Sequence, residues 1–160
     1  FDFENTAKGA EWIDSIASRA RKIMDSSKAE RVVGHGDWSG KHFRFDGDNI
    51  VMIYDWDSLR LEDEIELVGM AAATFSANWD VPGGLSPTPE EAYSFAREYE
   101  KIRGKTFTKE ELKRISASAA YIIAYSARCE HSRDPDEQNI NAGDFRSALQ
   151  HAQEDMYFNV

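Results

Sequence analysis

Four polar residues that could do chemistry lie close together in one short part of the sequence. His35 and Asp37 follow an apolar run, His42 comes five positions after Asp37, and Asp55 ends a second apolar run. Paired carboxylates suit phosphoryl transfer, in which one accepts the proton of an attacking hydroxyl and the other holds a divalent cation against phosphate oxygens. The same four residues, together with Asp57, also suit a hydrolytic metal centre. Composition does not separate these two chemistries.

The segment between the two acids predicts a β-hairpin that brings them together. Residues 46–49, Asp-Gly-Asp-Asn, are typical of a tight turn, and short apolar stretches flank them on both sides. Because the second strand of a hairpin returns antiparallel to the first, its end lies near the start of the first strand. We therefore expect Asp37 and Asp55 to face the same end of the structure.

The two motifs together resemble those of a known kinase family. His-Gly-Asp at 35–37, followed by Asp-Trp-Asp at 55–57, is similar to the catalytic loop and metal-binding segment of the aminoglycoside phosphotransferase and choline kinase family, small-molecule relatives of the protein kinases. The order of the motifs, the hairpin between them and their separation match that family's pattern. The segment 60–64 is also similar to the family's Arg-Leu-Gly-Asp-Pro continuation, with Asp63 aligned to its Asp.

The resemblance implies a role for each residue of the motifs. Asp37 would be the catalytic base, Asp55 the Mg²⁺ ligand, and His35 a supporting residue that braces the loop. The family has Asn five positions after the catalytic Asp, and this chain has His42 there. His42 would therefore stand at the second metal position, although Mg²⁺ prefers oxygen ligands to imidazole. Asp57 is a further candidate for contacts to the metal or the substrate.

Aromatic residues near the motifs could also contact a substrate. Trp38, Trp56 and Trp79 could each stack on a ring or a cation. For Trp56 the sequence favours packing in the core. Trp38, which directly follows Asp37, is the candidate that we place at the substrate.

The activity that the resemblance implies is transfer of the γ-phosphate of ATP to a hydroxyl of a small molecule, with Mg²⁺ as cofactor. No long segment separates Asp55 from the next predicted helix, which favours a small acceptor over a protein. The net charge of −10 argues against nucleic-acid binding and would suit a cationic acceptor such as an aminoglycoside or choline. Two alternatives stay open: a non-catalytic, pseudokinase-like binding lobe, with His42 as the sign of lost metal chemistry, and a metal-dependent hydrolase.

Length and composition indicate a single globular domain over residues 1–160, with 41% hydrophobic and 30% charged residues. No apolar run approaches the roughly 20 residues that cross a membrane, and no signal-peptide pattern begins the sequence. The single cysteine, Cys129, cannot form an internal disulfide. We therefore expect a cytoplasmic protein that does not enter a membrane.

The resemblance covers only the C-terminal lobe of such a kinase. Neither the Gly-rich loop nor the lysine-bearing strand of a nucleotide-binding lobe occurs in the sequence. The chain begins with Phe1 rather than Met, which suggests that it was cut from a longer one. We expect an N-terminal lobe in the same or another chain, with poor ATP binding and little activity in its absence.

Outside the hairpin, the sequence predicts helices. Apolar residues recur at three- and four-residue spacing, and Thr88 and Thr108 each begin a capping box. The predicted fold is mainly α with a small β-hairpin, the C-terminal lobe of the protein-kinase-like fold. The predicted helices span about 4–25, 62–77, 89–103, 109–129 and 143–156.

Overall fold

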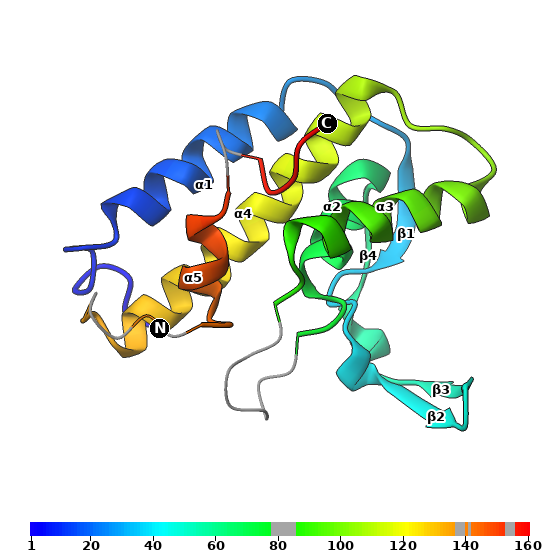
Figure 1. Cartoon of the computed structure of the whole chain (residues 1–160), viewed down its shortest axis with the longest axis horizontal. Helices are drawn as coiled ribbons and strands as arrows, with labels where there is room; N and C mark the ends of the chain where they lie inside the picture. The colour runs from blue at the N-terminus through cyan, green and yellow to red at the C-terminus, as the bar shows by residue number, and fades with distance from the viewer. Residues whose placement is uncertain (78–85, 137–139, 141, 153–155) are drawn as a thin grey trace.

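The protein is mainly helical with two small antiparallel sheets (Figure 1), so the predicted class is confirmed in outline. The computed structural model describes residues 1–77, 86–136, 140, 142–152 and 156–160. The helices are α1 (Glu11–Met24), α2 (Glu64–Thr74), α3 (Pro89–Arg103), α4 (Lys109–Arg133) and α5 (Phe145–Gln150). The strands are β1 (Arg31–His35), β2 (Phe43–Asp46), β3 (Asn49–Ile53) and β4 (Leu59–Asp63).

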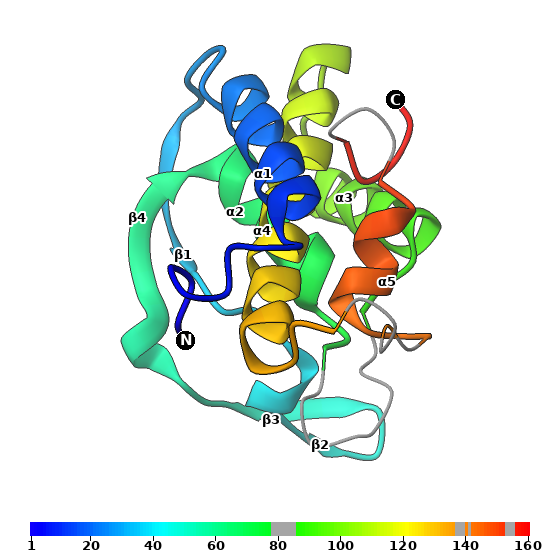
Figure 2. The ribbon, with the colours of Figure 1, turned by 90° about the vertical axis from the view of Figure 1, so that its left-hand side faces the viewer.

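The long helix α4 is the centre of the core. Helices α1, α2 and α5 pack against it, and Figure 2 shows α1 running alongside it. Each packing helix contributes a fully buried aliphatic side chain to one hydrophobic cluster, which also contains Ile115 and Ile123 of α4. These side chains are Ile13 from α1, Ile65 from α2 and Leu149 from α5. Burial of such side chains is the main stabilising contribution to a fold of this kind. No helix within the described ranges is long and apolar enough to cross a membrane.

The hairpin formed by β2 and β3 agrees with the sequence prediction. Phe43 pairs with Ile53 and Asp46 with Asn49, which leaves a two-residue turn. Gly47 in that turn has φ 58°, in the left-handed region that glycine adopts without steric cost. In Figure 1 the hairpin projects away from the helical body, so most of its side chains are exposed.

The second sheet was not predicted. Strand β1 pairs antiparallel with β4, from Arg31 opposite Asp63 to His35 opposite Leu59. The predicted helix beginning at residue 62 was therefore wrong at its start, because residues 59–63 are held in strand pairing. Helix α2 begins only after Asp63, whose side chain accepts a hydrogen bond from the Ile65 backbone N–H and caps the helix.

The other helix boundaries agree with the predictions in part. Both predicted capping boxes are present, at the starts of α3 and α4. Helix α1 begins at Glu11 rather than near residue 4, because Gly9 has φ 83°, which is incompatible with a continuing right-handed helix. Helix α5 ends at Gln150 rather than at 156. Residues 153–155 of that predicted helix lie outside the described residues.

A buried ion pair joins three parts of the fold. Nη2 of Arg114, on α4, donates to Asp63 Oδ2 at 2.9 Å, and its Nε donates to the carbonyl oxygen of Met24 at the end of α1 at 3.1 Å. Asp63 Oδ2 also accepts from the Ala29 backbone N–H at 2.7 Å. Arg114 is 2% exposed and Asp63 is 3% exposed. The pair therefore fixes the end of β4 relative to α1 and α4, away from solvent.

Close packing of α2 against α4 depends on Gly69. A Cβ atom at this position would lie 2.4 Å from the Ile115 carbonyl oxygen and 2.5 Å from Ser118 Cβ. We expect Gly69→Ala to lower the free energy of unfolding by about 1–3 kcal/mol, because the two helix backbones must move apart. Urea denaturation measures this loss. Gly40→Ala is the control, since its Cβ would lie 3.3 Å from the nearest atom, the Phe75 carbonyl oxygen; an equal loss there would contradict the packing explanation.

Candidate functional site

His35 is the last residue of β1 and connects the loop that carries Asp37 with the segment that leads into Asp55. Its Nδ1 accepts a hydrogen bond from the Asp37 backbone N–H at 3.2 Å, and its Nε2 lies 3.3 Å from the Tyr54 carbonyl oxygen. A carbonyl can only accept, so a neutral ring with its proton on Nε2 satisfies both contacts. Through these two bonds His35 holds the loop that carries Asp37 against the segment that leads into Asp55, as a bracing residue would.

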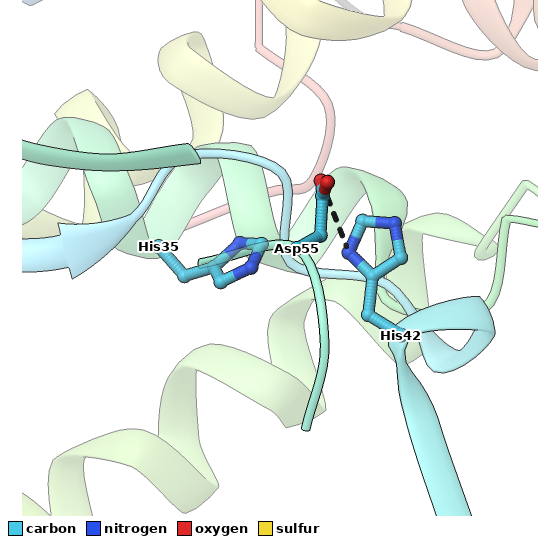
Figure 3. Close-up of side chains that lie close together, drawn as sticks. All are labelled: His35, His42 and Asp55. Atoms are coloured by element: carbon cyan, nitrogen blue, oxygen red, sulfur yellow. Dashed lines mark ion pairs between the residues drawn. The ribbon is translucent and has the colours of Figure 1, made fainter. Parts of the chain in front are cut away.

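The imidazole of His42 lies between the two predicted acids. Its Nε2 is 3.6 Å from Asp37 Oδ2, and its Nδ1 is 3.7 Å from Asp55 Oδ2, the contact drawn in Figure 3. His42 itself is 9% exposed, whereas the Asp37 and Asp55 side chains are 44% and 39% exposed. The structure therefore brings both acids to one place on the surface, where a ligand can reach them.

Asp55 has an unusual backbone conformation. It has φ 65° and ψ 38° and is the only residue other than glycine with positive φ among the residues that the structure describes. Left-handed backbone at such a residue costs free energy and is found most often at functional sites. It immediately precedes a 3₁₀ turn, Trp56–Ser58. Asp57 lies in this turn and not in a strand with Asp55.

The Ser58 hydroxyl donates to Asp55 Oδ2 at 3.0 Å. This hydrogen bond is the main reason why the pKa of Asp55 lies below its ordinary value. A side-chain hydrogen bond with Asp57 lowers that pKa further, by a smaller amount. We expect Ser58→Ala to raise the pKa of Asp55 toward that ordinary value, measured by ¹³C NMR of its carboxyl carbon during a pH titration. An unchanged pKa would show that the hydroxyl does not stabilise the carboxylate.

Two basic side chains at the loop were not predicted. Lys41 Nζ lies 3.1 Å from Asp37 Oδ2, because the 3₁₀ turn Gly40–His42 directs Lys41 back toward the loop. Arg60 Nη2 donates to the Gly36 carbonyl oxygen at 3.2 Å. A Cβ on Gly36 would lie 1.9 Å from Arg60 Nε, so only glycine admits this contact. The sequence signal for Lys41 was its position next to His42, within the motif.

A cavity of about 570 Å³ lies beside Asp37. Its walls come from the loop after β1, from β4 and from helices α1, α2, α4 and α5. Its lining includes three acids and three bases, so its charge is balanced, together with two tyrosines of α4. These residues are Asp37, Glu62, Glu66, Arg21, Lys41, Arg60, Tyr121 and Tyr125. A second hollow of about 610 Å³, beside α3 and α5, contains none of the predicted site residues.

The aromatic candidates differ in their surroundings. Trp38 is half-buried, and its ring packs edge-on against Phe43 at 4.7 Å and His35 at 5.8 Å between ring centroids, so it supports the loop. The prediction that Trp56 packs in the core was wrong, because its side chain is 54% exposed. Its Nε1 donates to the Ile53 carbonyl oxygen, and its ring lies edge-on to His35 at 6.1 Å between ring centroids. Trp79 lies outside the described residues.

The chain was compared with known proteins at three levels. No family model, curated protein or solved structure matches it. The chemistry of the site therefore has to be argued from its own geometry.

His35, His42 and Asp55 form the metal-binding candidate among the described residues. Each offers a potential ligand atom, and these atoms lie within 4.8 Å of one another (Figure 3). The exposed Asp55 carboxylate is a suitable ligand for Mg²⁺, but imidazole is not the ligand that Mg²⁺ prefers. Both ring nitrogens of His35 already contact the backbone, so His35 could bind a metal only by releasing the loop. This argues against the five-residue hydrolytic centre.

Proposed function

We propose that this chain is the catalytic-loop lobe of a small-molecule kinase, which transfers the γ-phosphate of ATP to a hydroxyl of a small acceptor. The observation that carries the proposal is the position of Asp37 and Asp55 on either side of one imidazole, both open to solvent. Asp37 also lines the 570 Å³ cavity. An acceptor in that cavity and a phosphate beside Asp55 would therefore meet at Asp37.

In this reaction the acceptor hydroxyl attacks the γ-phosphorus. The new O–P bond forms as the bond to the ADP oxygen breaks, and Asp37 orients the hydroxyl and accepts its proton. Mg²⁺, when bound at Asp55, would neutralise charge on the phosphate oxygens. Lys41 lies beside Asp37 and would place a positive charge near the transferred group. Most of the rate enhancement then comes from positioning and charge neutralisation.

The acceptor is proposed to be a small hydroxylated molecule. A volume of about 570 Å³ falls within the roughly 300–1,000 Å³ of small-molecule pockets. The phenol rings of Tyr121 and Tyr125 and the carboxylate of Glu66 provide surfaces that a cation could contact. Burial raises the pKa of Glu66. A cation bound beside its carboxylate would lower that pKa again. The bases in the same lining offset this preference, so a cationic acceptor remains a prediction that the net charge supports.

An exposed apolar surface adjoins the site. Val33 and Leu61 are paired across β1 and β4 and are 71% and 51% exposed, on the face opposite Gly34, which packs toward Leu67 of α2. On the neighbouring hairpin, Ile50, Val51 and Met52 are also exposed. We propose that the nucleotide, and the N-terminal lobe that binds it, cover this exposed apolar surface, as the kinase-like fold implies. That lobe would be part of the same chain or of another one.

The position of His42 also favours a second candidate, a binding lobe without catalysis. Its imidazole stands between the acids where the family has an asparagine, and it would exclude a cation if it bound both carboxylates itself. In that case the cavity would still bind a small molecule, but no phosphate would be transferred.

The test is phosphoryl transfer from [γ-³²P]ATP by the full-length gene product, with divalent cation and a panel of aminoglycosides, choline and other small alcohols. Label in an acceptor would support the kinase. Acceptor-independent release of phosphate would support a hydrolase. Binding of an acceptor, measured by calorimetry, without any turnover would support the binding lobe.

Lys41 provides a separate prediction. We expect Lys41→Met to lower kcat/KM for phosphoryl transfer by on the order of 10- to 100-fold, because a positive charge beside the transferred phosphate is lost. Initial rates at several ATP concentrations measure this. Lys101→Met is the matched control, since Lys101 pairs with the exposed Glu98 on α3 and neither residue lines the cavity. Equal rates in the wild type and Lys41→Met would remove Lys41 from the mechanism.

A further inference from the structure

The Nδ1 atom of His42 is buried and has no hydrogen-bond partner. Asp55 Oδ2 lies 3.7 Å from it, which is too far for a hydrogen bond. Most buried polar side-chain atoms in proteins have a partner, so an unpaired one is a position that a water, an ion or a ligand would fill. Figure 3 shows the edge of the imidazole that carries Nδ1 directed toward the Asp55 carboxylate.

Each ring nitrogen of His42 faces a carboxylate at a similar distance. Nε2 is 3.6 Å from Asp37 Oδ2, and an ionised carboxylate can only accept. Asp55 Oδ2 lies at 3.7 Å from Nδ1, so the two carboxylates compete for the ring proton. The tautomer with the proton on Nε2 leaves the lone pair of Nδ1 directed at Asp55, and a cation bound at Nδ1 would itself select that tautomer. Metal-binding histidines commonly donate their other ring N–H to a carboxylate, and Asp37 lies on that side of the His42 ring, at 3.6 Å.

In that tautomer, two electron-pair donors face each other across 3.7 Å. We propose that a divalent cation binds between His42 Nδ1 and Asp55 Oδ2, and that this pair selects borderline transition-metal ions, of the Co²⁺ and Zn²⁺ class, over Mg²⁺. The role of the ion in catalysis rests on the proposed function, whereas its binding does not. Open coordination positions would be filled by water or by phosphate oxygens.

The separation of the two atoms agrees with this choice. An ion about 2.1 Å from each atom would subtend an angle of roughly 120° between them, nearer the tetrahedral value that Zn²⁺ adopts than the right angle of an octahedral Mg²⁺ site. Imidazole nitrogen is also a ligand that transition metals prefer and Mg²⁺ does not. The asparagine-to-histidine departure from the family pattern would therefore change the preferred metal rather than abolish metal binding.

The test is a titration of the full chain with Co²⁺ or Mg²⁺ alone, by calorimetry and by the visible absorption bands of bound Co²⁺. We expect one Co²⁺ per chain, bound more tightly than Mg²⁺. His42→Asn should weaken Co²⁺ binding by at least the roughly 10- to 100-fold typical of losing a partner of a metal ligand, without weakening Mg²⁺ binding. The exposed His151 gives the matched control, His151→Asn, which should bind Co²⁺ as the wild type does.

Equal affinity of the wild type for the two ions, or Co²⁺ binding that survives His42→Asn, would overturn the inference. If that variant does not fold, paramagnetic shifts in the wild type decide: Co²⁺ must shift the His42 ring protons, and unshifted resonances overturn the proposal. Loss of the selectivity with phosphoryl transfer intact would refute only the metal assignment. Selective Co²⁺ binding in a protein that transfers no phosphate would refute only the kinase.

Discussion

Replacing Asp37 by asparagine is expected to lower kcat for phosphoryl transfer by on the order of 10²- to 10⁴-fold, the range that a positioned general base contributes. The amide keeps the shape of the side chain but cannot accept the proton of the acceptor hydroxyl. It also loses the charge that attracts Lys41, which lies 3.1 Å away. Single-turnover rates with saturating ATP and acceptor measure the chemical step directly.

The control makes the same chemical change in the hairpin turn. Asp48→Asn alters an exposed carboxylate that lies outside the site. It should leave kcat unchanged and the circular dichroism spectrum of both variants should match the wild type. Phosphoryl transfer that survives Asp37→Asn would refute the assignment of Asp37 as the base.

The largest expected effect on stability comes from Asp63. We expect Asp63→Ala to lower the free energy of unfolding by about 3–5 kcal/mol, the cost of removing one partner of a buried ion pair. Arg114, 2% exposed, would be left as a buried charge without its carboxylate. The variant also loses the cap of α2 and the acceptor for the Ala29 backbone N–H. Urea denaturation at neutral pH measures the difference.

The effect of Asp63 should depend on pH in a stated direction. Burial tends to raise its pKa, but the hydrogen bond from Ala29 and the Arg114 guanidinium outweigh burial and hold the pKa of Asp63 below its ordinary value. A carboxyl with a lowered folded-state pKa contributes its full stability above the unfolded value of about 3.9. The contribution is lost as the pH falls through the lower folded-state pKa.

The difference between wild type and Asp63→Ala should therefore be constant from roughly pH 5 to 7 and should shrink below about pH 4. Asp25→Ala is the control, because its pair with Arg21 is exposed and should contribute far less. A variant difference that stayed constant down to about pH 2 would show that the ionised carboxylate of Asp63 is not the stabilising species.

The parts of the fold predicted from sequence are those fixed by local chemistry. The hairpin follows from a turn sequence whose glycine adopts positive φ, and the starts of α3 and α4 follow from capping boxes. Strand β4 was missed because its conformation depends on pairing with β1, which lies about 30 positions earlier. A local pattern does not encode that partner.

The candidate site shows the same division. The meeting of Asp37 and Asp55 was predicted because a hairpin joins them, and the structure places both beside His42. The position of Lys41 was missed because it depends on the 3₁₀ turn that precedes β2. The exposure of Trp56 was missed because the sequence does not show whether another part of the fold covers an apolar side chain in this turn.

The most direct test of the account is a double-mutant cycle on the rate of phosphoryl transfer with Asp37→Asn, Asp55→Asn and the two together. Residues that act as a unit on one phosphate give losses far from additive in free energy. The account predicts a measurable wild-type rate, a large loss in each single variant, and a double variant hardly slower than the slower single one. Losses that multiply, or a wild type that transfers no phosphate to any acceptor, would contradict it.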